Sequence, residues 1–268
     1  MSDLSVLIVG CGDVGGRLAR QMLARGWHVS GLRRTVGQLP HGVVPVAADL
    51  AEPAIPSAWP SHAPDYLVYC VAASQHDEAG YQAAYVQGLR HVQGWLAERG
   101  QRPRRLLFVS SSSVFAQKGG EWVDEQSPTS PEGYSGRVML EAEQLALAGE
   151  CPASVVRLTG IYGPGREWLL SQVRQGYRVA EQPPLYGNRI HAEDAASLLA
   201  FLLQADADGR ALDDCYLGAD DDPAPLAEVV GWLRAYMGVT HWSDEQRVRR
   251  PGRQLFSDAL PPGRGLGP

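Results

Sequence analysis

Short apolar runs alternate with amphipathic segments over roughly the first 160 residues of the chain. The apolar runs are Leu4–Val9, His28–Leu32, Val43–Ala47, Tyr66–Val71, Arg105–Ser110 and Ala153–Leu158. The segments with apolar residues at helical spacing are Val14–Arg25, Gly80–Arg99 and Ser135–Ala148. Continuous apolar runs are typical of strands covered on both faces. Alternation of such strands with helices predicts an α/β fold with a parallel, doubly wound sheet.

A glycine-rich segment, VLIVGCGDVGG, follows the first predicted strand and opens the first predicted helix. Its glycines have GxGxxG spacing, which lets the backbone turn tightly and approach a pyrophosphate at a helix N-terminus. We therefore expect a dinucleotide here; the alternative is a tight strand-to-helix turn without a ligand. The loop residues expected to contact the cofactor are Gly10, Cys11, Gly12, Asp13, Val14 and Gly15.

The second predicted strand ends in two adjacent arginines, Arg33 and Arg34, and no acidic residue lies between Ala24 and Gly37. An acid at the end of this strand usually binds the ribose hydroxyls of NAD, whereas guanidinium groups bind the 2′-phosphate of NADP. The sequence therefore favours NADP(H) over NAD(H). A solvated basic turn is the alternative interpretation.

The alternation weakens after Thr159, where turn-rich stretches separate three further helical segments. These segments are Glu167–Gln175, Ala192–Leu203 and Leu226–Met237. We predict a single NAD(P)-binding, Rossmann-type domain over residues 1–248, with a small C-terminal substrate lobe mainly from residues 160–248. Residues 249–268, rich in Pro and Gly, are expected to form a loosely ordered tail.

The composition argues against several classes of protein. A net charge of −6 disfavours binding to nucleic acid or to an anionic membrane, because both need a basic surface. The first apolar run is too short to span a membrane. The four cysteines form no CxxC pair and have no histidine at a zinc-binding spacing, so no metal site is expected. They are interpreted as reduced thiols of a cytoplasmic protein.

Several motifs in a fixed order carry a family resemblance. The glycine loop is followed by FVSSSSVF, YSGRVMLEAEQ, RLTGIYGPGR and NRIHAED. Over roughly residues 4–240, the chain resembles the extended and atypical short-chain dehydrogenases/reductases, and more narrowly the NAD(P)-dependent epimerase/dehydratase group. The resemblance implies a small-molecule substrate and a homodimer. It also implies cofactor contacts by Asp49, Leu50, Ala72 and Ala73, although loop capping or strand packing would explain these residues as well.

The catalytic residues of this family are a Ser or Thr, a Tyr, and a Lys four residues after the Tyr. The matching positions here are Ser111, Tyr134 and Val138, so the lysine is absent. Lys118 is the only lysine of the chain, and no other YxxxK motif exists. A tyrosine needs a nearby cation to act as an acid or base near neutral pH. As a hypothesis, Arg137 supplies that charge, because it lies three residues after Tyr134 and so close to the same face of the predicted helix.

Two classes of function remain open from the sequence. The first is an NADP(H)-dependent oxidoreductase or epimerase/dehydratase-like enzyme, in which Ser111 holds the substrate oxygen and Tyr134 exchanges a proton. The second is a non-catalytic NADP(H) sensor with a decayed active site. Val138 supports the sensor, and so does Tyr85, which occupies the position of a family asparagine. A structural partner that binds no nucleotide is a third, weaker interpretation.

Overall fold

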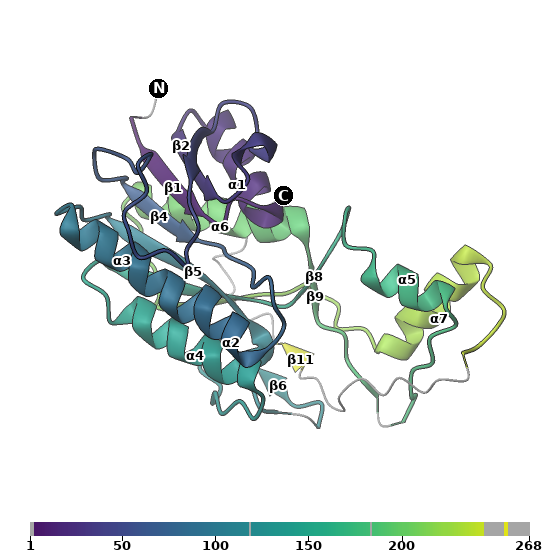
Figure 1. The fold of residues 1–268 in the computed structure, drawn as a ribbon. Coiled ribbons are helices and arrows are strands. Elements are labelled where there is room, and N and C mark those ends of the chain that lie inside the picture. Colours follow the sequence, from purple (N-terminus) through teal and green to yellow (C-terminus); the bar gives the residue numbers. More distant parts are fainter. Residues whose placement is uncertain (1–2, 118, 183, 244–254, 257–268) are drawn as a thin grey trace.

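A computed structural model describes residues 3–117, 119–182 and 184–243, together with the backbone of residues 255–256. Its centre is a seven-stranded, wholly parallel sheet in the order β10-β7-β5-β4-β1-β2-β3 (Figure 1). The strands are β1 (Ser5–Val9), β2 (His28–Arg33), β3 (Val44–Ala47), β4 (Tyr66–Tyr69), β5 (Arg105–Ser111), β7 (Ala153–Leu158) and β10 (Cys215–Gly218). The chain direction across the sheet reverses between β1 and β4, where open α/β sheets bind ligands.

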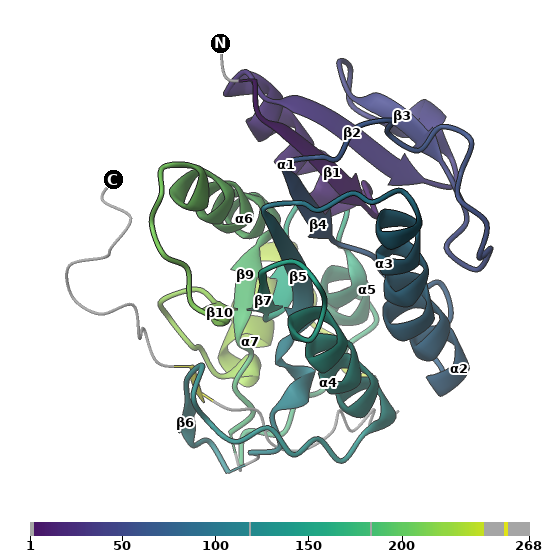
Figure 2. The ribbon, with the colours of Figure 1, turned by 90° about the vertical axis from the view of Figure 1, so that its left-hand side faces the viewer.

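Helices cover both faces of this sheet, as Figure 2 shows. One face carries α1 (Asp13–Ala24) and α6 (Ala192–Ala207), and the other carries α3 (Gly88–Glu98) and α4 (Tyr134–Leu147). Successive residues of the central strands alternate between two buried cores, because side chains of a strand point to opposite faces. Ile8, for example, packs with the α1 and α6 side, whereas Leu7 packs with α3 and α4.

The helix before α3 contains a π-helical stretch. Gln82–Gln87 (η2) separates α2 (Glu78–Tyr81) from α3. The Tyr69 hydroxyl of β4 donates to the Ala84 carbonyl at 2.5 Å within this stretch, and a Cβ at Gly88 would lie 2.5 Å from the same hydroxyl. A side chain inserted into the helical hydrogen-bond ladder is a common cause of such a turn. Tyr85 lies within this stretch.

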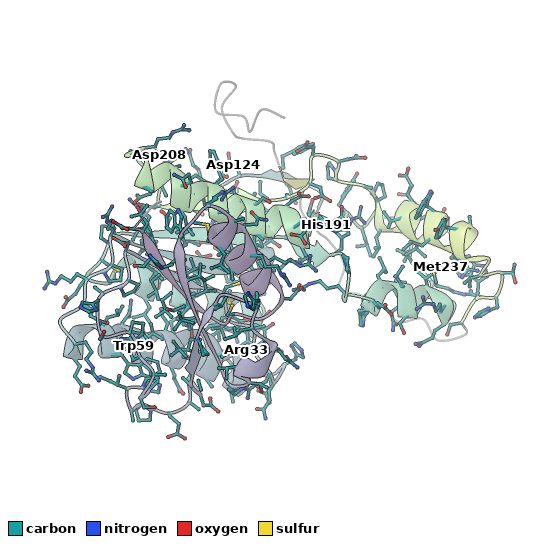
Figure 3. The ribbon with its side chains drawn as sticks, turned by 90° about the horizontal axis from the view of Figure 1, so that it is seen from above. Arg33, Trp59, Asp124, His191, Asp208 and Met237 are labelled. Atoms are coloured by element: carbon teal, nitrogen blue, oxygen red, sulfur yellow. The ribbon has the colours of Figure 1, made fainter. Side chains whose placement is uncertain are left out.

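A small lobe projects from the sheet on one side (Figures 1 and 3). It contains α5 (Trp168–Arg174) and α7 (Leu226–Met237), which share a core of Val173, Tyr177, Leu226 and Val230. The paired strands β8 (Gly160–Tyr162) and β9 (Arg189–His191) join it to the sheet, and Figure 3 labels His191 at this junction. The remaining short elements are η1 (Val36–Gln38), η3 (Ser112–Val114), and β6 (Trp122–Val123) paired with β11 (Leu255–Phe256).

The predicted fold class, a Rossmann-type doubly wound parallel sheet with a small C-terminal lobe, is confirmed. The predicted strand Tyr66–Val71 ends earlier, at Tyr69, and the predicted helix Ala192–Leu203 continues to Ala207. Apart from residues 255–256, the predicted tail at residues 249–268 lies outside the described residues. The domain limits of 1–248 stay a prediction. Within the described part of the chain, no helix is long and apolar enough to cross a membrane.

Candidate functional site

A cleft of about 700 Å³ opens at the carboxyl ends of β1, β2, β4 and β5. It lies at the reversal point of the sheet, between the loop after β1 and the loop after β4. The predicted site residues that line it are Gly10, Gly12, Asp13, Val14, Arg33, Arg34, Asp49, Leu50, Ala72 and Ser111. Predicted site residues that do not line it are Cys11, Gly15, Ala73, Tyr134 and Arg137. The glycine loop, the arginine pair and one of the two predicted catalytic hydroxyls therefore share one cleft.

Each of the three loop positions Gly10, Gly12 and Gly15 favours glycine for a different physical reason. Gly10 has a φ of +84°, and a Cβ there would lie 2.5 Å from the Cys70 carbonyl oxygen. A Cβ at Gly15 would lie 2.7 Å from the Gly10 carbonyl oxygen, so Gly15 serves the close packing of α1 on β1. A Cβ at Gly12 would meet only that same oxygen, at 3.9 Å. The fold does not itself exclude a side chain at Gly12 by contact, and the open space fits a ligand that approaches the backbone.

Asp13, the first residue of α1, holds two arginines. Arg17 Nε lies 2.8 Å from Asp13 Oδ1, and Arg166 Nε lies 2.8 Å from Asp13 Oδ2. Partial burial would raise the pKa of Asp13, but the hydrogen bonds and charges of the two guanidinium groups outweigh it, and the pKa is lowered. Asp13 is therefore ionised at neutral pH. Arg17 also pairs with Glu193 at the start of α6.

Cys11, the loop residue between the first two glycines of the motif, belongs to the protein core. Its side chain is fully buried, and burial raises the pKa of its thiol to about 11. Cys70, after β4, has a pKa raised by burial to about 12. Both thiols are consequently protonated at neutral pH. The Cys11 side chain packs in the apolar core on the α1 and α6 side of the sheet.

The two arginines at the end of β2 differ in their surroundings. Arg33 Nη2 donates to Gln38 Oε1 at 2.8 Å, and Arg33 Nη1 donates to the Cys11 carbonyl at 3.4 Å. Arg34 is exposed at the mouth of the cleft. Figure 3 labels Arg33 on the sheet body. The pair places two positive charges where the second strand meets the glycine loop.

The residues after β3 and β4 complete the far wall. Asp49 Oδ1 accepts a hydrogen bond from the Ala51 N–H at 3.0 Å, so the carboxylate also organises its own loop. His91 Nδ1 lies 2.7 Å from the Leu50 carbonyl oxygen. The Ala73 N–H donates to the Tyr85 hydroxyl at 3.3 Å. Tyr85 lines the cleft, and its hydroxyl holds the backbone at Ala73, which does not line the cleft.

The predicted catalytic residues do not converge. Ser111 lines the cleft, and its hydroxyl accepts a hydrogen bond from the Ser113 N–H at 3.2 Å, capping η3. The Tyr134 hydroxyl instead donates to the His76 carbonyl, and its ring packs edge-on against Tyr81, with centroids 5.5 Å apart. The Tyr134 proton is therefore engaged by a backbone carbonyl in this arrangement.

Arg137 and the position of the absent lysine face different environments. Arg137 donates to the Glu132 carbonyl at 2.5 Å and lies 3.4 Å from the Glu78 carboxylate. Val138 is 1% exposed and packs inside the core shared by α3 and α4. Arg137 is therefore held by Glu132 and Glu78, which do not line the cleft, and in this arrangement it makes no contact with the Tyr134 hydroxyl among the described residues.

Some residues that line the cleft were not predicted from the sequence. Arg166 comes from the loop before α5 and reaches Asp13, a residue 153 positions earlier. Thr159 also lines the cleft, and its buried hydroxyl oxygen has no hydrogen-bond partner among the described residues. No local pattern distinguishes Thr159, and the contact of Arg166 with Asp13 depends on how the chain folds after β7. The GPG turn before Arg166 was the available signal.

A buried polar network supports the cleft wall. Glu143 Oε1 accepts from Ser110 Oγ at 2.6 Å, and the two carboxylate oxygens accept from Arg157 Nε and Nη2 at 3.0 and 2.8 Å. Ser110 also lines the cleft. The network ties β5, α4 and β7 together directly behind Ser111. No group of three potential metal-ligating side chains occurs among the residues described.

Comparisons with known proteins agree with this architecture. Residues 6–218 match the NAD dependent epimerase/dehydratase family. Protein YeeZ of Escherichia coli (strain K12) is 31% identical over 225 residues, covering 78% of this chain and 77% of its own. A solved structure from Methylobacillus flagellatus, provisionally described as an NAD-dependent epimerase/dehydratase, is 34% identical with a TM-score of 0.80, covering 96% of this chain and 90% of its own.

A third relative bears on the chemistry of the family. The Streptomyces antibioticus protein named "Probable dTDP-4,6-dihydroxy-2-methyloxan-3-one 4-ketoreductase" is 29% identical over 135 residues, covering 48% of this chain and 46% of its own. Together with the family match, this similarity supports a nicotinamide cofactor and an oxidoreductase-like or epimerase-like role. The expected resemblance is confirmed, and the chain belongs to the NAD-dependent epimerase/dehydratase family.

Proposed function

We propose that the protein is an NADP(H)-dependent oxidoreductase or epimerase/dehydratase-like enzyme that acts on a small carbonyl or hydroxyl compound, such as a sugar-nucleotide derivative. One observation carries the cofactor choice. Arg33 and Arg34 line the same cleft as the glycine loop, at the point where the 2′-position of the adenine ribose would lie. The strand end that carries them has no acid to bind a free 2′-hydroxyl.

The lining of the cleft supports the binding of a dinucleotide at several points. The open space at Gly12 and the N-terminal N–H groups of α1 would take the pyrophosphate. Asp49 and Leu50 would contact the adenine, and Ala72 would pass beside the cofactor. The unpartnered Thr159 hydroxyl offers a further polar contact deep in the cleft.

The proposed chemistry uses two hydroxyl groups of the chain. A bound nicotinamide cofactor supplies hydride transfer to or from a substrate carbon. Ser111 holds the substrate oxygen in the cleft, and Tyr134 donates a proton to that oxygen in reduction or accepts it in oxidation. Because the Tyr134 hydroxyl now donates to His76, productive binding must replace that contact. Arg137 is proposed to stabilise the deprotonated tyrosine once its contacts with Glu132 and Glu78 rearrange.

A non-catalytic NADP(H) sensor remains the second candidate. It is favoured by the burial of Val138, where the family lysine would stand, and by the engagement of Tyr134 with a backbone carbonyl. In that case the cleft binds cofactor, and Ser111 and Asp49 serve only as loop caps. The homodimer, through the helices at 80–99 and 135–148, and the cytoplasmic location stay predictions under either candidate.

The cofactor proposal is tested with a double variant, Arg33→Gln with Arg34→Gln. Charge-assisted hydrogen bonds contribute about 1.5–3 kcal/mol, so the Kd for NADPH should rise about 10-fold to 100-fold. The Kd for NADH should change less than about threefold. Arg99→Gln is a matched control, since it removes an exposed arginine at the end of α3, away from the cleft. Equal weakening of both cofactors would contradict a 2′-phosphate role.

The choice between enzyme and sensor needs turnover. NADPH absorbance is followed with a panel of carbonyl compounds and keto-sugar nucleotides, using wild type, Ser111→Ala and Tyr134→Phe. An enzyme of the proposed kind consumes NADPH, and Tyr134→Phe lowers kcat about 100-fold or more while leaving NADPH affinity unchanged. Intact NADPH binding without consumption on any substrate of the panel would favour the sensor.

A further inference from the structure

We propose that Arg166 is a ligand of the cofactor pyrophosphate, held ready by Asp13, and that cofactor binding thereby fixes the loop between β8 and α5 over the cleft. This inference rests on the proposed function. It assigns a binding role to a residue that belongs to the lobe and not to the glycine loop. The argument starts from the charges around the first turn of α1.

Asp13 places an ionised carboxylate at the end of the cleft where a pyrophosphate would bind. A carboxylate beside two phosphate groups is repulsive unless cations neutralise it. Arg17 is already shared, since it pairs with both Asp13 and Glu193. Arg166 pairs only with Asp13, through Nε, and no other partner of its guanidinium occurs in the described part of the chain.

The free side of the Arg166 guanidinium is therefore available to an anion. Arg166 lines the cleft, and its side chain is 36% exposed, against 14% for Arg17. The planar guanidinium has five N–H donors, and Asp13 uses one of them. The remaining donors suit bidentate binding of phosphate oxygens. Asp13 thus orients the cation without consuming its capacity.

The loop that carries Arg166 is built to be positioned by such contacts. Gly163 and Gly165 have φ of +132° and +86°, and Arg17 Nη2 donates to the Pro164 carbonyl at 3.4 Å. The loop leads directly into α5. Arg17 of α1 and Arg166 of this loop both pair with Asp13, and together they connect the loop before α5 to the start of α1. Cofactor phosphate would add a third connection and reduce the freedom of the lobe entrance.

The test measures cofactor affinity by calorimetry in Arg166→Gln and in a matched control, Arg174→Gln. Arg174 is an exposed arginine of the same lobe, in the last turn of α5. Loss of one charge-assisted contact predicts an approximately tenfold rise in the NADPH Kd for Arg166→Gln. The control should stay within about twofold of wild type. Adenosine 2′-monophosphate, which lacks a pyrophosphate, should bind both variants as it binds wild type.

An Asp13→Asn background separates direct contact from charge balance. If Arg166 binds the pyrophosphate, Arg166→Gln still weakens NADPH binding when position 13 is neutral. If Arg166 only neutralises Asp13, the substitution has no effect in that background, and the inference is overturned. Equal weakening of NADPH and adenosine 2′-monophosphate would also overturn it, because the effect would then not follow the pyrophosphate. A wild-type protein that binds no NADPH would instead refute the proposed function itself.

Discussion

The side chain four residues after Tyr134 lies inside the protein, among apolar neighbours. Val138 packs in the core between α3 and α4, whereas a lysine at this position of the family would have to reach the cleft. The sequence alone identifies the substitution, but it does not indicate where position 138 points. Met139, the next residue, lines the cleft. The surroundings of position 138 are therefore apolar, as the valine requires.

Placing a lysine at position 138 should consequently lower the stability of the folded protein. Val138→Lys buries an ammonium group without a partner, which costs about 3 kcal/mol or more of the free energy of unfolding. Arg137→Lys is the control, because it places a lysine on the exposed face of the same turn and should cost little. Urea unfolding of both variants measures the difference. A stable Val138→Lys protein with increased turnover would show that position 138 reaches the cleft.

The cysteines around the loop provide a second prediction at this scale. Burial raises the pKa of Cys11 to about 11 and that of Cys70 to about 12. Both thiols should therefore react slowly with iodoacetamide at neutral pH in the folded protein, and rapidly in guanidinium chloride. Mass spectrometry of the labelled peptides gives the rates. Folded Cys11 reacting as fast as the unfolded chain would contradict its burial.

The same shifts have a defined effect on stability. In the unfolded chain these thiols ionise near an ordinary pKa of 9.0, whereas in the folded protein they keep their protons up to about 11 and about 12. Their contribution to stability is therefore complete below about pH 9 and is lost as the pH rises through the folded values. Unfolding curves measured between pH 8 and 11 should show this decline. A Cys11→Ala variant should show a shallower one.

At the scale of elements, the β1 to β2 unit was the most predictable part of the molecule. Its strands have continuous apolar runs, its helix has one apolar face, and its loop has the glycine spacing that the close approach of α1 to β1 requires. The π-helical stretch at η2 was not predictable, because it depends on the Tyr69 hydroxyl of a neighbouring strand. Edge strand β10 was missed because its side chains are mostly half-buried and give no clear apolar period.

Two neighbouring glycines test the loop packing. Gly15→Ala places a Cβ 2.7 Å from the Gly10 carbonyl oxygen and 3.1 Å from Ile8 Cγ2, so we expect a loss of about 1–3 kcal/mol and weaker cofactor binding. Gly16→Ala is the matched control, since its Cβ would meet only Pro40 Cγ at 3.9 Å. In the helix it should be neutral or stabilising by up to about 1 kcal/mol. Equal effects in thermal unfolding would contradict the packing argument.

At the scale of the whole molecule, the sheet body and the lobe have very different cores. Two large apolar clusters hold the sheet between its helices, whereas the described part of the lobe has a core of only four buried apolar residues. The sequence predicted a small lobe after Thr159, because the strand and helix alternation weakens there. It could not predict that Arg166 reaches back to Asp13, since that contact depends on the position of the lobe against α1.

The small lobe core predicts uneven local stability. Backbone amides of α5 and α7 should exchange with deuterium faster than those of α6, which is buried against the sheet along most of its length. Hydrogen exchange followed by mass spectrometry resolves the three helices. Uniform protection across them would mean that the lobe and the body unfold as one unit.

The most direct test of the account is a calorimetric titration of the purified wild-type protein with NADPH and, separately, with NADH. The cleft at the reversal point of the sheet, with its glycine loop and arginine pair, predicts one cofactor per chain and a Kd for NADPH at least about tenfold lower than that for NADH. Tighter binding of NADH would reverse the cofactor assignment. No binding of either nucleotide would contradict the central claim.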